Sequence, residues 1–293
     1  MQRGVTEVLL GVEQGKYPHG NTVVVRGPDG RVIIDPSLSL WEPDATPPEV
    51  DQVLLTHVHE DHVAGLSRYP DTPVAVNHRD APHLASLDAL VEMYGIPAES
   101  VDEFAAGLVE DFHFAARPDV EALDDDHVVD LGGGVTVTAV PTPGHTAGHT
   151  AWLIEPDGVL VIGDIDLTGF GPYYGDVVSS LEDFVESMAR VREIEAAWYV
   201  TFHHKAVVEG HAAFVEAIDA YAAVVDRRDD AILAYLDQPR TIADLIDHRF
   251  LYRPHVDLPW VDSAEERTSR RHLARLAERG HAVEVATDTW VRS

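Results

Sequence analysis

The chain has 293 residues, 45% of them apolar, and a formal net charge of −30, which makes a polyanionic partner such as nucleic acid unfavourable. It contains no cysteine, which excludes disulfides, thiolate metal sites and a cysteine nucleophile. No apolar run is long enough to span a bilayer, and residues 1–4 lack the pattern of a signal peptide, so we expect a cytoplasmic protein with no membrane partner.

The first 210 residues contain short strand patterns that alternate with helical ones. Thr22–Arg26 and Arg31–Ile34 flank a Gly-Pro-Asp-Gly turn and are predicted to form a hairpin. Further strands are predicted at 53–55, 73–77, 127–130, 135–140, 150–154, 159–162 and 197–202, and helical segments around 65–69 and at 82–117 and 181–195. Two successive sets of strands with helices between them predict an α/β fold with two sheets packed face to face and helices outside.

From about residue 211 the strand pattern gives way to helical spacing. Phe214, Ile218, Tyr221 and Val225 recur at helical intervals, and more helices are predicted around 232–236, at 241–248 and from 263 onward. Residues 282–286 and 289–291 read as a small hairpin. Three helices and a hairpin are typical of a winged helix. We therefore predict a catalytic domain at 1–210 and a helical, winged-helix domain at 211–293, joined by a shared helix that begins near the boundary.

The run from Thr56 to His62 concentrates metal-binding side chains directly after a strand pattern. In extended backbone His57 and His59 point to the same side and can bind one cation together. Asp61 and His62 lie one turn further along and can reach a second cation. Two cations about 3.5–4 Å apart can share a bridging hydroxide. The run therefore predicts a two-metal site.

Three other predicted strands also end in potential ligands. His145 follows the strand at 135–140, Asp164 follows the strand at 159–162, and His203 and His204 follow the strand at 197–202. Active sites commonly gather at one edge of a sheet, so these side chains are expected to meet the first group. A carboxylate such as Asp164 has two oxygens and can bridge two cations.

Together these motifs resemble those of the metallo-β-lactamase superfamily. The resemblance covers roughly residues 5–210; residues 142–149 are most similar to the hydroxyacylglutathione hydrolase-like branch, and the tail is similar to the winged-helix extension of β-lactamase-like protein 2 relatives. It implies a four-layer αββα sandwich. It also implies two divalent metal ions, usually Zn²⁺ and sometimes iron or manganese.

The resemblance also implies a ligand set. The first ion would be held by His57, His59 and His145, the second by Asp61, His62 and a histidine of the last strand, with Asp164 as the bridge. The family commonly has a glycine on each side of its last histidine, whereas this chain has Phe202-His203-His204-Lys205. Residues 206–209 match the family's usual continuation best when His204 takes the ligand position, so His204 is predicted in preference to His203.

Several neighbouring residues are expected to assist. His149 is predicted to form a hydrogen bond behind the ligands, and Asp35 and Thr56 to orient them. Asp166 is expected to point away from the site, and Lys205 could meet a substrate carboxylate.

The predicted function is metal-dependent hydrolysis of an ester-like bond, most plausibly a thioester or lactone, in a small-molecule substrate. A metal-bridging hydroxide would attack the carbonyl, with Asp61 as both ligand and proton acceptor. Cleavage of RNA is an alternative that the net charge opposes; the nearest thing to a basic patch is Arg267, Arg270, Arg271, Arg275 and Arg279. An iron-dependent persulfide dioxygenase and a non-catalytic DNA-binding or scaffold protein are further alternatives. The tail could also form a homodimer contact.

Overall fold

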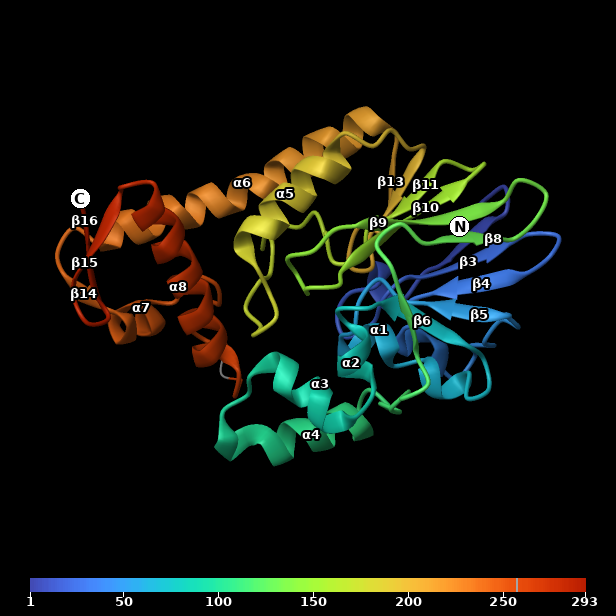
Figure 1. Cartoon of the computed structure of the whole chain (residues 1–293), viewed down its shortest axis with the longest axis horizontal. Coiled ribbons are helices and arrows are strands. Elements are labelled where there is room, and N and C mark those ends of the chain that lie inside the picture. Colours follow the sequence, from blue (N-terminus) through green and yellow to red (C-terminus); the bar gives the residue numbers. More distant parts are fainter. Residues whose placement is uncertain (257) are drawn as a thin grey trace.

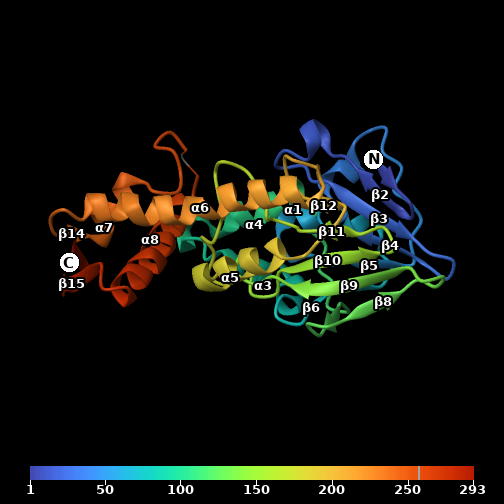
Figure 2. The ribbon, with the colours of Figure 1, turned by 90° about the horizontal axis from the view of Figure 1, so that it is seen from above.

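Two β-sheets packed face to face form the centre of the molecule (Figure 1). The computed structural model describes residues 1–256 and 258–293. One sheet has the strand order β1-β2-β3-β4-β5-β6-β7 and the other the order β13-β12-β11-β10-β9-β8. Helices α1 to α4 cover the outer face of the first sheet, and α5 and α6 cover that of the second (Figures 1 and 2). The predicted αββα sandwich is therefore confirmed.

The elements have the following bounds. The first sheet contains β1 (Gln2–Arg3), β2 (Thr6–Leu9), β3 (Thr22–Arg26), β4 (Arg31–Ile34), β5 (Gln52–Leu54), β6 (Val74–Asn77) and β7 (Glu121–Leu123). The second contains β8 (Val128–Asp130), β9 (Thr136–Pro141), β10 (Thr150–Glu155), β11 (Val159–Val161), β12 (Trp198–Val200) and β13 (Val207–Glu209). The helices of the sandwich are α1 (Glu60–Val63), α2 (Ala81–Leu84), α3 (Leu87–Tyr94), α4 (Val101–Glu110), α5 (Leu181–Arg192) and α6 (His211–Tyr235). Four short 3₁₀ helices lie at Val12–Gln14, Leu38–Trp41, Leu66–Arg68 and Ala98–Ser100.

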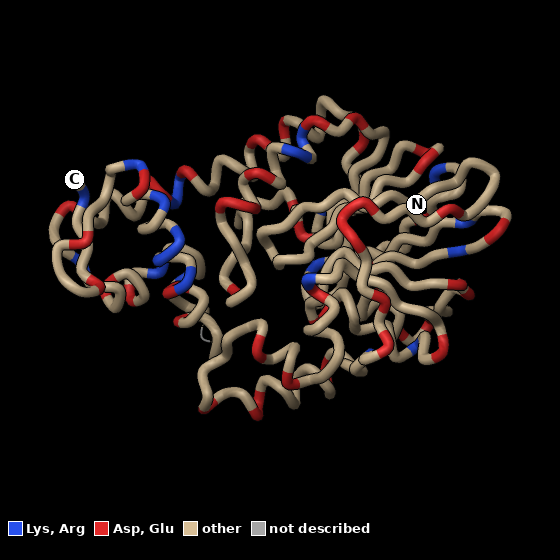
Figure 3. The backbone as a smooth tube through the Cα atoms, viewed as in Figure 1, with Lys and Arg blue, Asp and Glu red and all other residues tan. Residues whose placement is uncertain are grey.

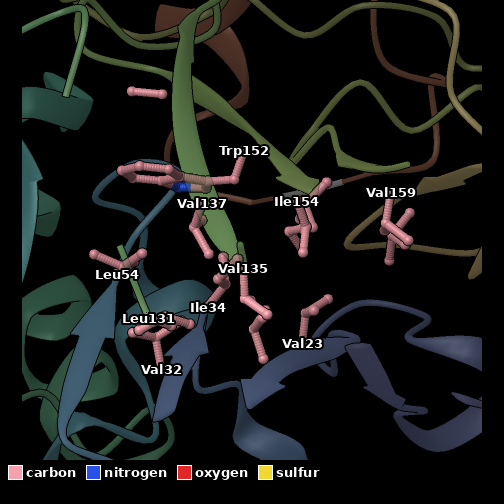
Figure 4. Close-up of a cluster of buried hydrophobic side chains, with 14 of the residues drawn as sticks. Val23, Val32, Ile34, Leu54, Leu131, Val135, Val137, Trp152, Ile154 and Val159 are labelled. Atoms are coloured by element: carbon pink, nitrogen blue, oxygen red, sulfur yellow. The ribbon is translucent and has the colours of Figure 1, made fainter. Parts of the chain in front are cut away.

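The apolar runs in the sequence form strands because both faces of the sheets are covered. In β3, Val23 and Val25 point into the core between the sheets, while Val24 packs beneath the outer helices. This alternation is the two-residue period of a strand, and a strand buried on both sides has no need of polar positions. Figure 4 shows Trp152 and Ile154 of the second sheet facing the first across this core.

Parallel pairing brings several strand ends to one edge of the sandwich. In the first sheet β4, β5 and β6 run parallel, and in the second β11 and β12 do so. Their carboxyl ends lead into the segments that hold the predicted ligands. The N–H of Thr150 donates to the carbonyl of Thr56 over 2.8 Å and joins the two sheets at this edge. The edge is thereby fixed as a place where side chains of both sheets meet.

The predicted hairpin of β3 and β4 is confirmed, with Val25 opposite Val32. The predicted helices and strands of the sandwich occur within a few residues of their expected bounds. The expectation that β12 is the last strand of the sandwich was wrong, because β13 pairs with it antiparallel. β13 is a short edge strand with no buried residue, so it has no continuous apolar signal. β1, β2 and β7 were also not predicted.

The C-terminal part has its own small core. α6 is followed by β14 (Arg240–Thr241), α7 (Ile242–His248), α8 (Val261–Glu278), β15 (Ala282–Ala286) and β16 (Thr289–Arg292). α6 is 25 residues long; its first half packs on the second sheet through Phe214 and Ile218, and its end joins the C-terminal core through Ile232. The hairpin and the helices expected at 241–248 and from 263 onward are present. The separate helix expected around 232–236 was wrong, because α6 continues without a break to Tyr235. The winged-helix assignment and the boundary at residue 211 stay predictions. In the part of the chain that the structure describes, no helix has both the length and the apolar character needed to cross a membrane.

Candidate metal centre

Four predicted ligands form a first cluster at the shared edge of the sheets. The potential ligand atoms of His57, His59, His145 and Asp164 all lie within 4.8 Å of one another. Nδ1 of His59 is 3.0 Å from Nε2 of His57 and 2.9 Å from Nε2 of His145. Nε2 of His145 is 3.2 Å from Oδ2 of Asp164. Ligand atoms about 2.0–2.1 Å from a tetrahedral zinc ion would lie about 3.3 Å apart, so the spacing fits one cation.

In each of these histidines, the ring nitrogen that points away from the cluster (the outer nitrogen) forms a hydrogen bond with an oxygen of the protein. Nδ1 of His145 donates to the carbonyl of Tyr173 over 2.9 Å, and Nε2 of His59 donates to Oδ2 of Asp176 over 3.0 Å. Nδ1 of His57 lies 3.0 Å from Oγ1 of Thr56. Since the Thr56 hydroxyl donates its own hydrogen to Asp35 over 2.7 Å, the histidine must be the donor.

Three inner nitrogens are then left facing one another. Lone pairs about 3 Å apart need positive charge between them, either a proton on His59 or a metal cation. A cation satisfies the three nitrogens and Asp164 at once, whereas one proton cannot. The donor set, neutral imidazole with carboxylate, suits zinc and related divalent ions.

A second cluster lies beside the first. It consists of Asp61, His62 and His203, all buried. Oδ2 of Asp61 is 2.9 Å from Nε2 of His203, yet this buried oxygen accepts no hydrogen bond from any described residue. Nδ1 of His203 donates to the carbonyl of Gly15 over 2.8 Å, so its Nε2 is free to bind a cation. Such an orphaned carboxylate oxygen is costly unless a cation binds it.

Asp164 lies between the two clusters. Its Oδ2 faces His145, as described above, and its Oδ1 is 2.9 Å from Nε2 of His62. Nδ1 of His62 is 3.0 Å from Oδ2 of Asp35, which leaves Nε2 to face Asp164. One carboxylate therefore presents one oxygen to each cluster, as the sequence pattern predicts for a bridging ligand.

The structure corrects the prediction of His204. The ring of His203 is buried against Asp61, whereas His204 is exposed and belongs to neither cluster. The backbone at His204 has φ +62°, and that at Ala206 has φ +57°, so the chain turns sharply just after His203. The turn carries the ring of His204 away from the edge. The match of residues 206–209 to the family pattern could not reveal this local turn.

We expect His203→Ala and His204→Ala to separate these two positions. The first variant should lose the second of two bound zinc ions, because it removes a ligand that no neighbour replaces. The second should keep both, because its ring contacts neither cluster. Metal content after dialysis, measured by elemental analysis, checks this. Two bound zinc ions in His203→Ala, together with only one in His204→Ala, would show that His204 is the ligand after all.

The buried carboxylates of the centre favour positive charge on the histidines beside them. Burial alone would lower the pKa of His59, but its hydrogen bond to Asp176 and nearby carboxylates raise that pKa to about 9. Burial likewise opposes protonation of His62, yet Asp164, Asp35 and Asp61 raise its pKa to about 10. A divalent cation would supply the same positive charge and displace these protons.

Residues behind the ligands hold them in place. Asp35 accepts hydrogen bonds from the N–H and hydroxyl of Thr56, both 2.7 Å long, which confirms its expected orienting role. His149 also takes its expected place. Its Nδ1 is 2.8 Å from Oγ1 of Thr142, and its Nε2 accepts from the N–H of Asp164 over 3.2 Å. Burial and the neighbouring His145 lower the pKa of His149 to about 3, so it is neutral and can accept.

Two acidic residues near the centre, Asp176 and Asp80, were missed from the sequence. Asp176 binds His59, as described above, from the loop that follows Asp164. Asp80 follows β6 and accepts from the N–H of Val58 and from the hydroxyl of Thr146, over 3.2 and 2.7 Å. Asp166 belongs to neither cluster, and burial and the nearby Asp164 raise its pKa to about 7. Its expected orientation away from the centre stays a prediction. Asp80 follows a strand at the same edge, which is the one signal that could have revealed it.

The fold and these clusters define a class of protein, an αββα sandwich with two adjoining clusters of potential metal ligands at one sheet edge. The family model described as "Metallo-beta-lactamase superfamily" matches residues 17–204. The chain therefore belongs to the metallo-β-lactamase superfamily, which confirms the resemblance seen in the sequence.

Individual proteins agree with this assignment. The chain is 24% identical over 217 residues to the β-lactamase-like protein 2 homolog of Caenorhabditis elegans, covering 74% of this chain and 61% of that protein. It is 30% identical over 133 residues to a hydroxyacylglutathione hydrolase of Acidiphilium cryptum, covering 44% and 41%. Relatives named as a thioesterase and as lactonases also match. The matches thus span less than two thirds of the first two relatives' own length.

A solved structure shares the fold over nearly the whole chain. The metallo-beta-lactamase family protein TTHA1429 from Thermus thermophilus superimposes with a TM-score of 0.72 at 23% identity and covers 99% of both chains. The C-terminal elements are therefore part of an arrangement that at least one other family member has.

Proposed function

We propose that this chain is a two-metal hydrolase that cleaves an ester-like bond, a thioester or a lactone. The observation that carries the proposal is the position of Asp164, which presents one carboxylate oxygen to each of two buried ligand clusters. The second cluster of Asp61, His62 and His203 offers ligands for a second cation beside the first. Two cations about 3.5–4 Å apart act together on a water molecule and a carbonyl.

The bound cations would supply a water of pKa near 7 and polarise the substrate carbonyl. The chain itself orients the ligands, excludes bulk water from them and offers a place for a proton. His57 and His62 are fully buried, and His59, His145 and His203 nearly so. Oδ2 of Asp61 accepts no hydrogen bond within the described chain and can accept a proton as well as bind a cation.

An ester-like substrate is supported by the relatives. One is named a hydroxyacylglutathione hydrolase, one an atrochrysone carboxyl ACP thioesterase and one an N-acyl homoserine lactonase. These names share the hydrolysis of an activated acyl group. The two-metal centre is suited to this reaction because it needs no serine or cysteine nucleophile, and the chain contains no cysteine.

The two lysines of the chain support a substrate that carries a negative charge. Lys16 and Lys205 are the lysines in the sequence, and both lie close along the chain to His203 or to its hydrogen-bond partner Gly15. Lys16 follows Gly15, whose carbonyl binds His203, and Lys205 lies two residues after His203. Lys16 also pairs with Glu13 over 3.1 Å on the surface. In a chain of net charge −30 this local positive charge favours an anionic group, a carboxylate or phosphate, beside the reacting bond.

Replacing both lysines by glutamine should raise KM for an acyl-coenzyme A thioester by roughly 5- to 30-fold at low salt, because two exposed charge contacts contribute about 0.5–1 kcal/mol each. The effect should shrink at high salt and be absent for a neutral acyl-N-acetylcysteamine thioester. Arg31→Gln is the matched control. Arg31 is the first residue of β4 and therefore lies at the end of that strand opposite to the metal centre. An equal change in KM for the neutral thioester would contradict the charge argument.

The proposed activity is tested with zinc-loaded protein on a panel of acyl thioesters, acyl lactones and single-stranded RNA. We expect turnover of a thioester or lactone that disappears in Asp164→Ala. RNA cleavage that is lost in the same variant, with no turnover of thioester or lactone, would overturn the proposal and favour a nuclease. Oxygen consumption with glutathione persulfide would instead identify the dioxygenase chemistry.

A further inference from the structure

The C-terminal helix α8 binds a loop that touches the metal ligands. Arg271 donates to the carbonyls of Tyr174, Asp176 and Ser179 over 2.6, 2.7 and 2.8 Å. Arg267, one turn earlier, donates to the carbonyl of Gly175 in the same loop and to that of Tyr94 at the end of α3. Figure 1 shows α8 reaching from the C-terminal part towards α3, and Figure 3 shows the basic residues gathered along it.

The loop at 173–179, here called the ligand loop, is what these arginines hold. Its Tyr173 carbonyl accepts from Nδ1 of His145 over 2.9 Å, and its Asp176 carboxylate accepts from Nε2 of His59 over 3.0 Å. The hydroxyl of Ser179 donates to the carbonyl of His145 over 2.7 Å. Every carbonyl that Arg271 binds therefore belongs to, or directly follows, a residue that contacts a ligand of the first cluster.

We propose that Arg271 is a positioning residue for the first cation site and acts through the ligand loop on His59 and His145. The C-terminal part is then a structural component of the metal centre, joined to it by two hydrogen bonds in series, from arginine to loop and from loop to ligand. The inference rests on the two-cation site of the proposed function and is independent of its substrate.

The neighbouring arginine of the same helix shows why this is more than general packing. Arg270 is exposed, pairs with Glu266 and Asp288 over 2.9 and 2.7 Å, and touches no residue of the ligand loop. Arg271 is partly buried and makes all its side-chain hydrogen bonds to loop carbonyls. Three carbonyls of one loop are gathered around a single guanidinium, which fixes the loop backbone rather than one side chain. Groups that orient metal ligands commonly change metal affinity by about 10- to 100-fold when removed.

The test compares Arg271→Gln with Arg270→Gln in the full chain after removal of metal. Co²⁺ is titrated while its visible absorption spectrum is recorded, and folding is checked by circular dichroism. We expect Arg271→Gln to raise the dissociation constant of the first Co²⁺ by about 10- to 100-fold and to alter its spectrum. Arg270→Gln should match the unmodified protein in both respects. Arg271→Lys keeps the positive charge and some hydrogen-bond donors, so its Co²⁺ dissociation constant should lie between those of Arg271→Gln and Arg270→Gln. If Arg271→Gln does not fold, Arg271→Lys provides the test.

A double-variant cycle separates positioning from simple loss of packing. If Arg271 acts through the ligand loop, Arg271→Gln should add less in the Asp176→Asn background than in the unmodified chain, because the route to His59 is already weakened while the route through Tyr173 to His145 remains. Unchanged Co²⁺ affinity and spectrum in Arg271→Gln or Arg271→Lys would overturn the inference, as would fully additive effects with Asp176→Asn. Failure of the unmodified chain to bind two Co²⁺ ions would instead contradict the proposed function itself.

Discussion

Asp164→Ala is expected to bind at most one zinc ion weakly and to lose catalytic efficiency by about 10²- to 10³-fold, comparable with the loss of a main electrostatic stabiliser in other enzymes. Asp164 is the residue whose two oxygens face both clusters, 2.9 Å from His62 and 3.2 Å from His145. Its removal takes a ligand from each site and leaves the remaining histidines with less negative charge to balance a cation. Elemental analysis and kcat/KM on the best thioester or lactone measure the two effects.

Asp102→Ala is the matched control for this variant, because Asp102 is an exposed aspartate in the first turn of α4. It should leave metal content and activity unchanged. Asp164→Asn adds a sharper comparison, since it keeps the size of the side chain and removes its charge. Two tightly bound zinc ions in Asp164→Ala would show that this carboxylate is not a bridge.

Zinc should stabilise the metal-free protein strongly. Without a cation the centre keeps three inner nitrogens about 3 Å apart and a buried oxygen of Asp61 with no hydrogen-bond donor in the described chain. A ligand present at 1,000 times its dissociation constant stabilises the folded state by about 4 kcal/mol per site. Two such sites should raise Tm by roughly 10 °C or more in a protein of this size. Thermal unfolding after chelation, with and without added zinc, measures the shift.

The variant Asp164→Ala, which lacks the bridging carboxylate, shows whether the increase in Tm comes from zinc bound at this centre. In Asp164→Ala the same zinc addition should raise Tm by only a few degrees at most. An equally large shift in that variant would mean that zinc stabilises the chain somewhere else. No shift in the unmodified protein would contradict the two-metal site.

Much of the centre could be predicted from the sequence because strands deliver side chains to a common edge. His57, His59, Asp61 and His62 follow β5, and Asp164 follows β11. Short apolar runs ending in histidine or aspartate are visible without any knowledge of the tertiary structure. The rule that parallel strands end at one edge then brings the groups together.

The remaining features depend on contacts that no local pattern encodes. Asp176 lies in an irregular loop and becomes part of the centre because Arg271, 95 residues later, binds the loop backbone. The selection of His203 over His204 depends on left-handed backbone just after the last ligand, at His204 and Ala206, where no glycine marks the turn in the sequence. β13 has no buried side chain and forms only because β12 offers it an edge.

Crystals of the zinc-loaded protein, measured on both sides of the zinc absorption edge, would show whether two cations are bound at this edge of the sandwich. We expect two anomalous peaks about 3.5–4 Å apart. One should lie among His57, His59 and His145, the other among Asp61, His62 and His203, with Asp164 touching both. The absence of anomalous peaks at this sheet edge, or a single peak beside His204, would contradict the two-metal site.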